Sequence, residues 1–440
     1  MHAPVVRARH AALFILAAAA IAATTSQLVV GSAGAAVTRA DAPTGTHWAG
    51  TWGASSQPAT PSSLLGTGST DVSAAGFNNQ TVRNIVYSSV GGSQVQVRVS
   101  NVFSTQPLVV GRVDIAVQRS GARLEPNTNH VLRFGGKNSI TIPPGAEAVS
   151  DPTTMTVPAL TNLAVSIYLP DATGPATYHA LAQQTNYIST TGNFAGQASG
   201  AAFATTTQSW YYLDDVNVLD PGQAPSTVVA LGDSITDGYA SQVNANDRWP
   251  NFLARRLEAQ QSAQPLGVVD EGISGNRILN DSACFGTNAL SRLDRDVLTQ
   301  AGVKDVILLE GINDIGFPQT PDTGCTAPNT SESAAQIIAG YEQIIARVHA
   351  AQIKIFGGTL TPFKKAAYWS PAAERKREAV NNWIRTSGAF DGVIDFAAAV
   401  ANPNDPQMFA PQYDSGDHLH PNDAGYQAMA NAVNLAMLEQ

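Results

Sequence analysis

A serine follows a short apolar run, Val228 to Leu231, in the segment VVALGDSITDGYA. A serine hydroxyl becomes an effective nucleophile only when a base accepts its proton, and histidine is the usual base near neutral pH. In the segment DHLHPN, Asp417 precedes His420 by three residues, so a short loop allows the carboxylate to hold the imidazole. Ser234, His420 and Asp417 are therefore the candidate nucleophile, base and supporting acid of an acyl-transfer reaction.

Attack on a carbonyl carbon places negative charge on its oxygen, and this charge needs hydrogen-bond donors that already point at it. The backbone N–H groups of Ser234 and Gly275 and the side-chain amide of Asn313 are the candidate donors of such an oxyanion hole. Gly275 allows the backbone to approach a substrate because it has no Cβ. Asn313 could instead cap the turn in which it lies.

Other polar residues near these candidates have more ordinary interpretations. Asp233 is expected to cap the helix that begins after it, because aspartate is a favoured N-cap residue. Asp417 and His420 could form half of a metal site, but no third or fourth ligand occurs at a suitable spacing, so no metal or other cofactor is expected. His418 is then expected to be a loop histidine.

The elements that must position these residues alternate between strands and helices in the second half of the chain. Continuous apolar segments predict buried strands at residues 227–232, 267–272, 305–311, 354–360 and 392–396. Helical patterns occur at residues 331–351, 371–386 and 422–438. Such alternation predicts a five-stranded parallel sheet with helices on both faces. Because ligands bind outside the carboxyl ends of these strands, the candidate residues should meet at one edge of the sheet.

Residues 45–220 predict an all-β sandwich, because short strands and turn signals follow one another without a helical pattern. Residues 93–101 and 163–169 alternate apolar and polar side chains, as half-buried strands do. Gly91 and Gly92 lie between the segment TVRNIVYSSV, residues 81–90, and the strand at residues 93–101, and predict a two-residue hairpin. A change of composition at residues 220–226 marks the expected boundary to an α/β domain at residues 226–440.

Aromatic residues of this first domain have two interpretations. They could form a platform on which sugar rings stack, or they could belong to the core or to the interface between the domains. The residues concerned are Trp48, Trp52, Trp210, Tyr211 and Tyr212.

Length and charge limit the domain count and the partners. The 440 residues exceed the size at which a single core usually keeps growing, so two domains are expected. The net charge of −9 and the lack of any Lys/Arg run argue against nucleic acid as a partner.

The first 36 residues have the pattern of a secretory signal peptide. Arg7 and Arg9 precede an apolar stretch at residues 11–23, and a run of small residues ends near Ala36. The apolar stretch is too short to span a bilayer stably, although a retained membrane anchor is the alternative. The mature protein is therefore expected to be secreted and to have no stable membrane anchor.

Two cysteines, Cys284 and Cys325, are the only ones in the chain. In an exported protein an even pair indicates a disulfide, although two unlinked buried thiols are the alternative. The bridge would close a loop of about 42 residues and contribute roughly 4 kcal/mol to stability. Each cysteine follows a segment with a candidate oxyanion donor, so we expect the bridge near the site; the alternative is that it staples whichever loops are long.

Four segments, in this order, resemble the GDSL or SGNH hydrolase family: GDSITDG, GISGNR, GIND and DHLHPN. The resemblance covers residues 226–440, and the family's usual Gly-Asp-Ser-Leu reads Gly-Asp-Ser-Ile here. It implies a flavodoxin-like three-layer α/β/α fold. It also implies the same roles for the nucleophile Ser234, the base His420, its support Asp417 and the oxyanion donors Gly275 and Asn313.

The region before this domain resembles, more weakly, the region that precedes it in secreted actinobacterial members of the family. The segments THWAGTWGAS, VRVSN and ITIPPGA carry this resemblance. Such members are described as esterases or lipases, and some act on acetylated plant polysaccharides.

The expected function is hydrolysis of a carboxylic ester by a secreted serine esterase, through an acyl-enzyme. The expected substrates are short-chain acyl esters or acetylated carbohydrates, either as small molecules or as polysaccharides. One alternative is a carbohydrate-binding protein whose SGNH-like domain is catalytically silent. Another is a lipase for longer chains, which would need an apolar lid; no long amphipathic insertion separates the four segments.

Overall fold

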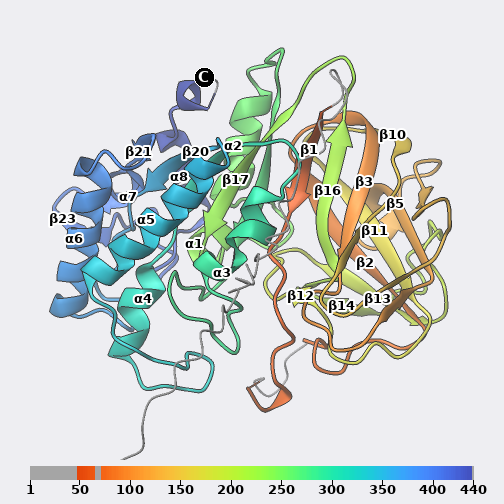
Figure 1. The fold of residues 1–440 in the computed structure, drawn as a ribbon, viewed down its shortest axis with the longest axis horizontal. Coiled ribbons are helices and arrows are strands. Elements are labelled where there is room, and N and C mark those ends of the chain that lie inside the picture. Colours follow the sequence, from red (N-terminus) through yellow and green to blue (C-terminus); the bar gives the residue numbers. More distant parts are fainter. Residues whose placement is uncertain (1–46, 65–70, 439–440) are drawn as a thin grey trace, which may run out of the picture. The chain divides into compact units, whose positions relative to one another are not determined.

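A computed structural model describes residues 47–64 and 71–438. The signal peptide predicted for residues 1–36 lies outside the described residues. Within the described ranges, no helix has both the length and the apolar character that a membrane crossing requires. Strands predominate up to Leu219, and strands and helices alternate after it (Figure 1).

The second half of the described chain is built around a parallel sheet. Its five described strands lie in the order β18-β17-β19-β20-β21, and every neighbouring pair is parallel. This order confirms the predicted flavodoxin-like sheet. The carboxyl ends of β18, β17 and β19 border the point where the winding of the chain reverses, which is where such sheets bind ligands. The strands are β17 Ser226–Gly232, β18 Leu266–Gly272, β19 Val303–Leu309, β20 Lys354–Gly358 and β21 Gly392–Ile394.

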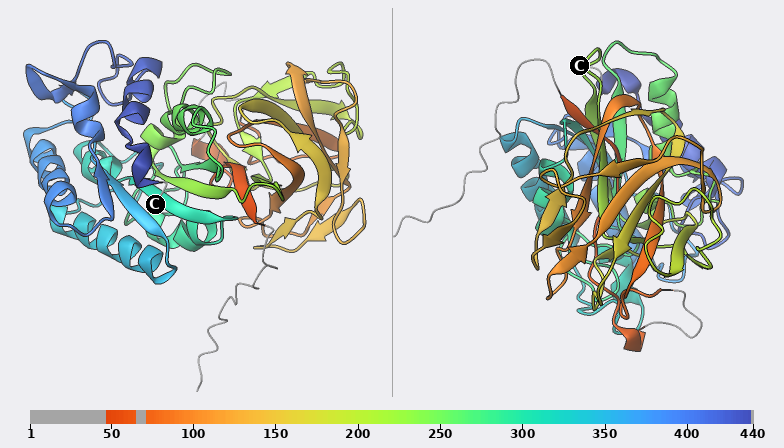
Figure 2. Two further views of the ribbon diagram at one scale, coloured as in Figure 1. Left: turned by 90° about the horizontal axis from the view of Figure 1, so that it is seen from above. Right: turned by 90° about the vertical axis from the view of Figure 1, so that its right-hand side faces the viewer.

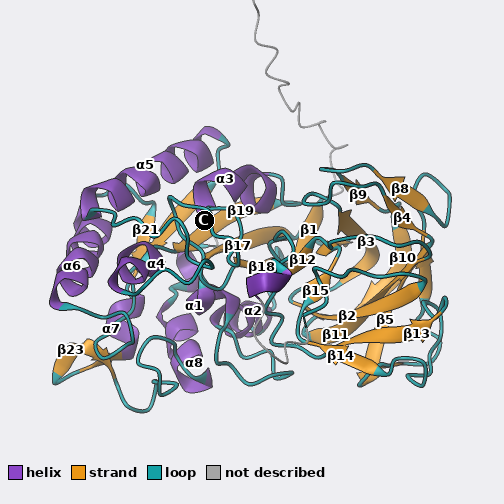
Figure 3. Ribbon diagram, turned by 90° about the horizontal axis from the view of Figure 1, so that it is seen from below, coloured by secondary structure: helices purple, strands orange, loops and turns teal. Residues whose placement is uncertain are grey.

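Helices cover both faces of this sheet, as the alternating pattern predicted. Figure 3 shows α3, α5 and α6 on one side of the sheet and α2, α7 and α8 on the other. The helices are α1 Ser234–Asp237, α2 Trp249–Glu258, α3 Ala289–Leu293, α4 Ile312–Gly316, α5 Ala334–Ala350, α6 Pro371–Thr386, α7 Phe396–Val400 and α8 Asp423–Ala432. Short helical turns lie at Ser62–Leu64, Asp294–Leu298, Phe317–Gln319 and Leu435–Met437.

Helix α5 is held by an N-terminal cap and by one buried face. The Ser333 hydroxyl accepts a hydrogen bond from the backbone N–H of Gln336, and the Gln336 side chain accepts one from the backbone of Ser333. The helix therefore begins at Ala334 rather than at residue 331. The last helix also differs from its predicted range, because α8 ends at Ala432. The apolar face of α5 is buried through Ile337, Tyr341, Ile344, Ile345 and Val348.

The first half of the described chain forms the predicted sandwich of antiparallel sheets, which share one apolar core (Figure 2). One sheet contains β1 Trp48–Gly53, β16 Leu213–Leu219, β3 Gly92–Ser100, β10 Thr153–Val157 and β9 Glu147–Val149. The other contains β14 Thr205–Thr207, β13 Asn186–Thr191, β2 Gln80–Ser88, β11 Thr161–Leu169, β5 Arg112–Ser120, β6 Arg123–Leu124 and β7 His130–Leu132. Two short pairs complete this part, β12 Tyr178–His179 with β15 Trp210–Tyr211 and β4 Leu108–Val110 with β8 Ile140–Ile142. A further pair, β22 Ala401–Asn402 with β23 Asp405–Phe409, lies in the second half of the described chain.

The hairpin predicted at Gly91 and Gly92 is wrong. Strand β2 pairs with β11 and β13, whereas β3 pairs with β16, β10 and β9, so the two strands lie in different sheets. The backbone N–H of Ser89 donates to the carbonyl of Thr51 at 2.8 Å, and the Thr51 hydroxyl donates to the carbonyl of Val90 at 2.6 Å. These bonds hold Ser89 and Val90 against β1 at the point where the chain passes from one sheet to the other.

Strand β1 also joins the sandwich to the parallel sheet (Figure 1). The backbone N–H of Gly50 donates to the hydroxyl of Thr227 at 2.8 Å. A Cβ at Gly267 would lie 2.1 Å from the carbonyl oxygen of Gly50, so glycine is required where the two backbones meet. The backbone N–H of Val268 donates to the Ser89 hydroxyl at 2.8 Å. The two halves of the described chain are therefore joined through buried backbone contacts.

The aromatic residues considered as a sugar platform are packed inside the molecule. Trp52 and Trp210 contact edge to face with ring centroids 4.9 Å apart, and Tyr211 stacks on Tyr178. Trp52, Trp210, Tyr211 and Tyr212 are at most 6% exposed, and Trp48 is half-buried at the start of β1. The interpretation as core and interface is confirmed for the four buried rings, and the platform is wrong for them.

Candidate active site

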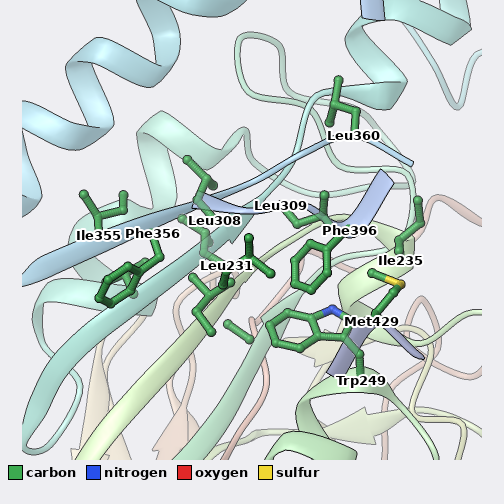
Figure 4. Packing of buried hydrophobic residues seen from close by; sticks show 14 of the residues in the cluster. Leu231, Ile235, Trp249, Leu308, Leu309, Ile355, Phe356, Leu360, Phe396 and Met429 are labelled. Carbon is green, nitrogen blue, oxygen red and sulfur yellow. The ribbon is translucent and has the colours of Figure 1, made fainter. Parts of the chain in front are cut away.

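Ser234 follows the end of β17 as the first residue of α1. Asp233 is the N-cap, and its carboxylate accepts a hydrogen bond from the backbone N–H of Ile235 at 3.0 Å, as predicted. Burial raises the pKa of Asp233 to about 7. Ile235 is buried in the same apolar core as Trp249 and Met429 (Figure 4), so the turn that carries Ser234 packs against this core.

The loop before α8 brings His420 to Ser234. The serine Oγ lies 2.8 Å from His420 Nε2, and His420 Nδ1 lies 2.6 Å from Asp417 Oδ2. Because a carboxylate can only accept, the imidazole hydrogen lies on Nδ1, and Nε2 can accept the hydroxyl hydrogen of Ser234. The fold thus joins these predicted residues although 186 positions separate Ser234 from His420. Ser234 is 5% exposed and His420 8% exposed.

Hydrogen-bond donors hold Asp417 as an anion. Its Oδ1 accepts the backbone N–H groups of Leu419 and His420, both at 2.9 Å, and the Ser415 hydroxyl at 3.0 Å. Partial burial disfavours the charged carboxylate, but the hydrogen bond and charge of His420 and these backbone donors outweigh it. They lower the pKa of Asp417 well below its ordinary value. The carboxylate is therefore ionised throughout the neutral range.

The loop after β18 carries Gly275 with a φ of +80°. A Cβ here would lie 2.4 Å from the ring of Phe285, so only glycine fits between the loop and that ring. The side-chain amide of Asn276 donates to the carbonyl of Phe285 at 2.8 Å and fixes the loop. The backbone N–H of Ile273 donates to the carbonyl of Gly232 at 3.0 Å, which places the loop beside the strand that leads to the serine.

Asn313 lies in α4, directly after β19, and is 3% exposed. Its Nδ2 donates to the backbone carbonyl of Asn276 at 2.9 Å, and its Oδ1 accepts the hydroxyl of Tyr368 at 3.3 Å. Burial raises the pKa of Tyr368 well above its ordinary value, so the phenol remains a donor. The two contacts orient the amide toward the Gly275 loop. The alternative that Asn313 caps its own turn is wrong, because the N-cap of α4 is Gly311.

Arg292 joins the loops of this site, and the sequence did not predict this role. Its side chain, 0% exposed, donates to the backbone carbonyl of Gly232 at 2.9 Å and to the side-chain oxygen of Asn276 at 3.0 Å. The planar fork of a guanidinium allows one side chain to hold together the end of β17 and the loop after β18. No local pattern in the sequence marks this arginine, since its partners come from distant segments.

Tyr239 is a second residue that the sequence interpretation missed. Its ring lies beside that of His420, with centroids 4.4 Å apart, and the residue is 43% exposed. The backbone is fixed at both ends, because the N–H of Tyr239 donates to the Ser234 carbonyl at 2.9 Å and the Tyr426 hydroxyl donates to the Tyr239 carbonyl at 2.6 Å. An aromatic residue directly after GDSITDG was the available signal.

Cys284 and Cys325 form the predicted disulfide. Phe285, next to Cys284, stacks on Phe317 with ring centroids 5.6 Å apart. Because the same Phe285 ring covers Gly275, the bridge and its aromatic neighbours tie the loop after β18 to the segment after α4. The bridge therefore lies where the sequence led us to expect it.

His418 is a loop residue, as predicted. Its Nδ1 lies 2.6 Å from Asp414 Oδ2, and its backbone has a φ of +64°. Among the residues that the structure describes, no group of three or more His, Cys, Asp or Glu side chains could hold a metal ion.

Ser234, His420 and Asp417 are joined in the order hydroxyl, imidazole and carboxylate at the carboxyl edge of a parallel sheet, the arrangement by which serine hydrolases activate their nucleophile. The profile of the GDSL-like Lipase/Acylhydrolase family matches residues 230–428, which contain all four segments noted in the sequence. Residues 230–428 therefore form a domain of this family, and the protein is a carboxylic ester hydrolase.

Solved structures similar to this chain align with about half of it. A GDSL-like lipase from Bacteroides thetaiotaomicron VPI-5482 is 19% identical, with a TM-score of 0.36, over 49% of this chain and 88% of that chain. A carbohydrate acetylesterase family member from Sinorhizobium meliloti is 19% identical, with a TM-score of 0.38, over 49% of this chain and 100% of that chain. The aryl esterase of M. Smegmatis is 16% identical, with a TM-score of 0.37, over 47% of this chain and 95% of that chain. No curated protein matches the chain.

Proposed function

We propose that the protein is a secreted serine esterase that hydrolyses short-chain acyl esters, including acetylated carbohydrates, through an acyl-enzyme. The observation that carries this proposal is the pair of contacts from His420 to Ser234 Oγ, at 2.8 Å, and to Asp417 Oδ2, at 2.6 Å. In this arrangement one imidazole can take the serine proton while the carboxylate stabilises the imidazolium that results.

In the proposed first step, Ser234 Oγ attacks the ester carbonyl carbon and its proton passes to His420 Nε2. The tetrahedral intermediate then expels the alcohol oxygen, which takes this proton from His420. The acyl group remains on Ser234. A water molecule attacks this acyl-enzyme, again giving its proton to His420, and collapse of the second intermediate releases the acid and restores the serine hydroxyl.

The oxyanion of each intermediate is held by the backbone N–H groups of Ser234 and Gly275 and by the amide of Asn313. Asn313 Nδ2 has two hydrogens, and its bond to the Asn276 carbonyl uses one of them. The other is the donor assigned to the oxyanion. Preorganised donors of this kind stabilise charge that develops only in the transition state, so they raise kcat.

Aromatic side chains around these donors support a small acyl group and a ring-bearing alcohol. Phe285 covers Gly275, and Phe317 packs against both Phe285 and Tyr368, which contacts Asn313. These large rings restrict the room next to the proposed oxyanion hole. Tyr239, whose ring lies beside His420 and which is 43% exposed, offers an apolar face to a sugar or aromatic alcohol.

Secretion is proposed from the signal pattern of the first 36 residues and is supported by the disulfide, since such bridges persist in oxidising compartments. Expression of the full chain in a bacterium with an intact secretion system tests it. We expect protein in the culture medium with an N-terminus close to residue 37, and cell-associated protein that begins at Met1 would contradict it.

Initial hydrolysis rates on p-nitrophenyl acetate, butyrate, octanoate and palmitate, and acetate release from acetylated xylan, test the proposed function. Ser234→Ala serves as the blank. We expect the highest kcat/KM on acetate or butyrate, together with acetate release from xylan. A maximum at octanoate or palmitate would indicate the longer-chain lipase, and the absence of any hydrolysis would indicate the carbohydrate-binding protein with a silent domain.

A further inference from the structure

His179 belongs to the sandwich but contacts the helix that begins with Ser234. It is the last residue of β12 and is 3% exposed. Its Nδ1 lies 2.9 Å from the backbone carbonyl of Ser55, and its Nε2 lies 3.1 Å from Asp237 Oδ1. Its ring is also packed against Trp210, with centroids 5.4 Å apart. The imidazole is thus held on several sides by buried groups.

Both hydrogen-bond partners of this imidazole are acceptors. The Ser55 carbonyl has no hydrogen to give, and Asp237 Oδ2 already accepts the backbone N–H and the hydroxyl of Ser274, at 2.8 and 2.6 Å. An ionised carboxylate that accepts from Ser274 also accepts from His179. Both ring nitrogens of His179 must then donate, which only the protonated imidazolium can do.

The carboxylate of Asp237 connects this imidazolium to the reaction site. Asp237 is the last residue of α1, whose first residue is Ser234, and Ser274 directly precedes Gly275. One ion pair therefore links the sandwich to the short helix of the nucleophile and to the loop of the proposed oxyanion hole. His179 and Asp237 are 58 positions apart in the sequence.

The charged groups around His179 favour its protonated form. Asp237 of α1 and Asp270 of β18 are acidic, and the Arg248 guanidinium opposes them; its Nε donates to the Asp237 carbonyl at 2.6 Å. These groups, with Tyr87 of β2, line a cavity of about 20 Å³. Burial acts to lower the pKa of His179, but the charge and hydrogen bond of Asp237 outweigh it and raise the pKa above its ordinary value. Glu271, the next residue on β18, accepts the Ser55 hydroxyl at 2.8 Å.

We propose that His179 is a protonated positioning residue of the esterase site, and that loss of its proton lowers kcat by releasing the Gly275 loop. The proposal rests on the proposed function, since it assumes that this loop supplies an oxyanion donor. A neutral His179 can donate to Ser55 or to Asp237 but not to both. The ring nitrogen without a hydrogen then faces an oxygen that can also only accept. Because His179 belongs to the sandwich, the sandwich is then a structural part of the catalytic unit.

The sign of the pH effect follows from the raised pKa of His179. The ion pair is complete below the ordinary histidine pKa of about 6.5 and is lost as the pH rises through the higher value of the folded protein. We therefore expect a decrease in kcat at a pH above about 6.5 that depends on His179. Because the loop acts on the transition state, KM should change much less than kcat.

Profiles of kcat and KM against pH for the wild type, His179→Gln and His349→Gln test this. His349→Gln is the matched control, because His349 Nε2 makes a similar 2.9 Å contact with Asp391 Oδ2 on the surface. We expect His179→Gln to lower kcat about 10- to 100-fold at pH 6 and to show no further decrease in kcat at alkaline pH. The control should keep both the wild-type kcat and its alkaline decrease. An alkaline decrease that persists unchanged in His179→Gln would overturn the proposal.

A measurement on the wild type covers the case in which His179→Gln does not fold. Nitrogen-15 labelling of the histidines shows by NMR how many hydrogens each imidazole carries. We expect two slowly exchanging N–H signals from His179 at pH 6, and a single one would overturn the proposal. If the wild type shows the imidazolium but hydrolyses no ester, or if Ser234→Ala is as active as the wild type, the proposed function fails independently of this test.

Discussion

The rings of Tyr239 and His420 lie 4.4 Å apart with their planes tilted by 42°, and Tyr239 remains 43% exposed. A contact between two aromatic rings contributes about 0.5–1.5 kcal/mol beyond area burial. An alcohol group with a ring that packs on Tyr239 should therefore bind less well when the tyrosine ring is removed. We predict that Tyr239→Ala lowers kcat/KM for p-nitrophenyl acetate about 2- to 10-fold. Tyr239→Phe, which keeps the ring, should retain the wild-type value, and equal losses in both variants would contradict the prediction.

Asn313 should contribute to kcat much more than to KM. The amide is assigned as an oxyanion donor, and removal of one such donor costs about 10²–10³-fold in kcat. We predict this loss for Asn313→Ala in steady-state assays with p-nitrophenyl acetate. Tyr368→Phe, which removes the hydrogen bond to Asn313 Oδ1, should lower kcat by a smaller factor. A loss confined to KM would mean that Asn313 only binds substrate.

Asp417→Asn should impair catalysis through the tautomer of His420. An asparagine amide that donates to Nδ1 places the imidazole hydrogen on Nε2, which then cannot accept the Ser234 proton. We predict a fall of about 10²–10⁴-fold in kcat while the circular dichroism spectrum stays unchanged. A fall of less than about tenfold would show that Asp417 does not support the base.

The same carboxylate predicts how stability depends on pH. Because the folded protein lowers the pKa of Asp417, its contacts stabilise the fold above the ordinary aspartate pKa of about 3.9 and are lost as the pH falls further. Urea unfolding of the wild type and of Asp417→Asn should therefore differ more at pH 7 than at pH 3.5. A difference that grows toward acid pH would contradict the lowered pKa.

The Cys284–Cys325 bridge should stabilise the protein and keep Phe285 over Gly275. Removal of a disulfide that closes a loop of this size costs about 2–4 kcal/mol. We predict that the double variant Cys284→Ala, Cys325→Ala unfolds at a lower urea concentration and that dithiothreitol lowers the midpoint only for the wild type. Identical midpoints for the wild type with and without reductant would contradict this role.

The α/β fold and the residues of the site could be predicted because their signals are local. Each strand of the parallel sheet is a continuous apolar run, and each of the four family segments lies at a strand end or before the last helix. Ser234, Gly275 and Asn313 could thus be assigned to one edge from strand order alone. The chemistry of serine and histidine then suggested the roles that we propose for Ser234 and His420.

The hairpin prediction was wrong because the strand that binds the residues before the turn, β1, is distant from them in the sequence. Gly91 and Gly92 are an ordinary hairpin signal, but Ser89 and Val90 bond to Thr51 of β1. Nothing in the local pattern shows that an earlier strand takes these bonds. The turn therefore connects two sheets instead of two paired strands.

The support of the site could not be predicted for the same reason. Arg292 donates hydrogen bonds to Gly232 and Asn276, and His179 contacts Asp237. Each of these contacts joins residues that only the fold brings together. Arginine in a short helix and histidine in a loop-rich segment are usually exposed, and no periodic pattern marked either one as buried.

Labelling with a fluorophosphonate, followed by mass spectrometry of the peptides, tests whether Ser234 is a nucleophile that His420 activates. Such reagents modify a serine whose hydroxyl is activated by a base. We expect one adduct, on the peptide that contains Ser234, which forms rapidly in the wild type and much more slowly in His420→Gln. An adduct at another serine, or labelling of Ser234 at the same rate in both proteins, would contradict the assignment of Ser234 and His420 as nucleophile and base.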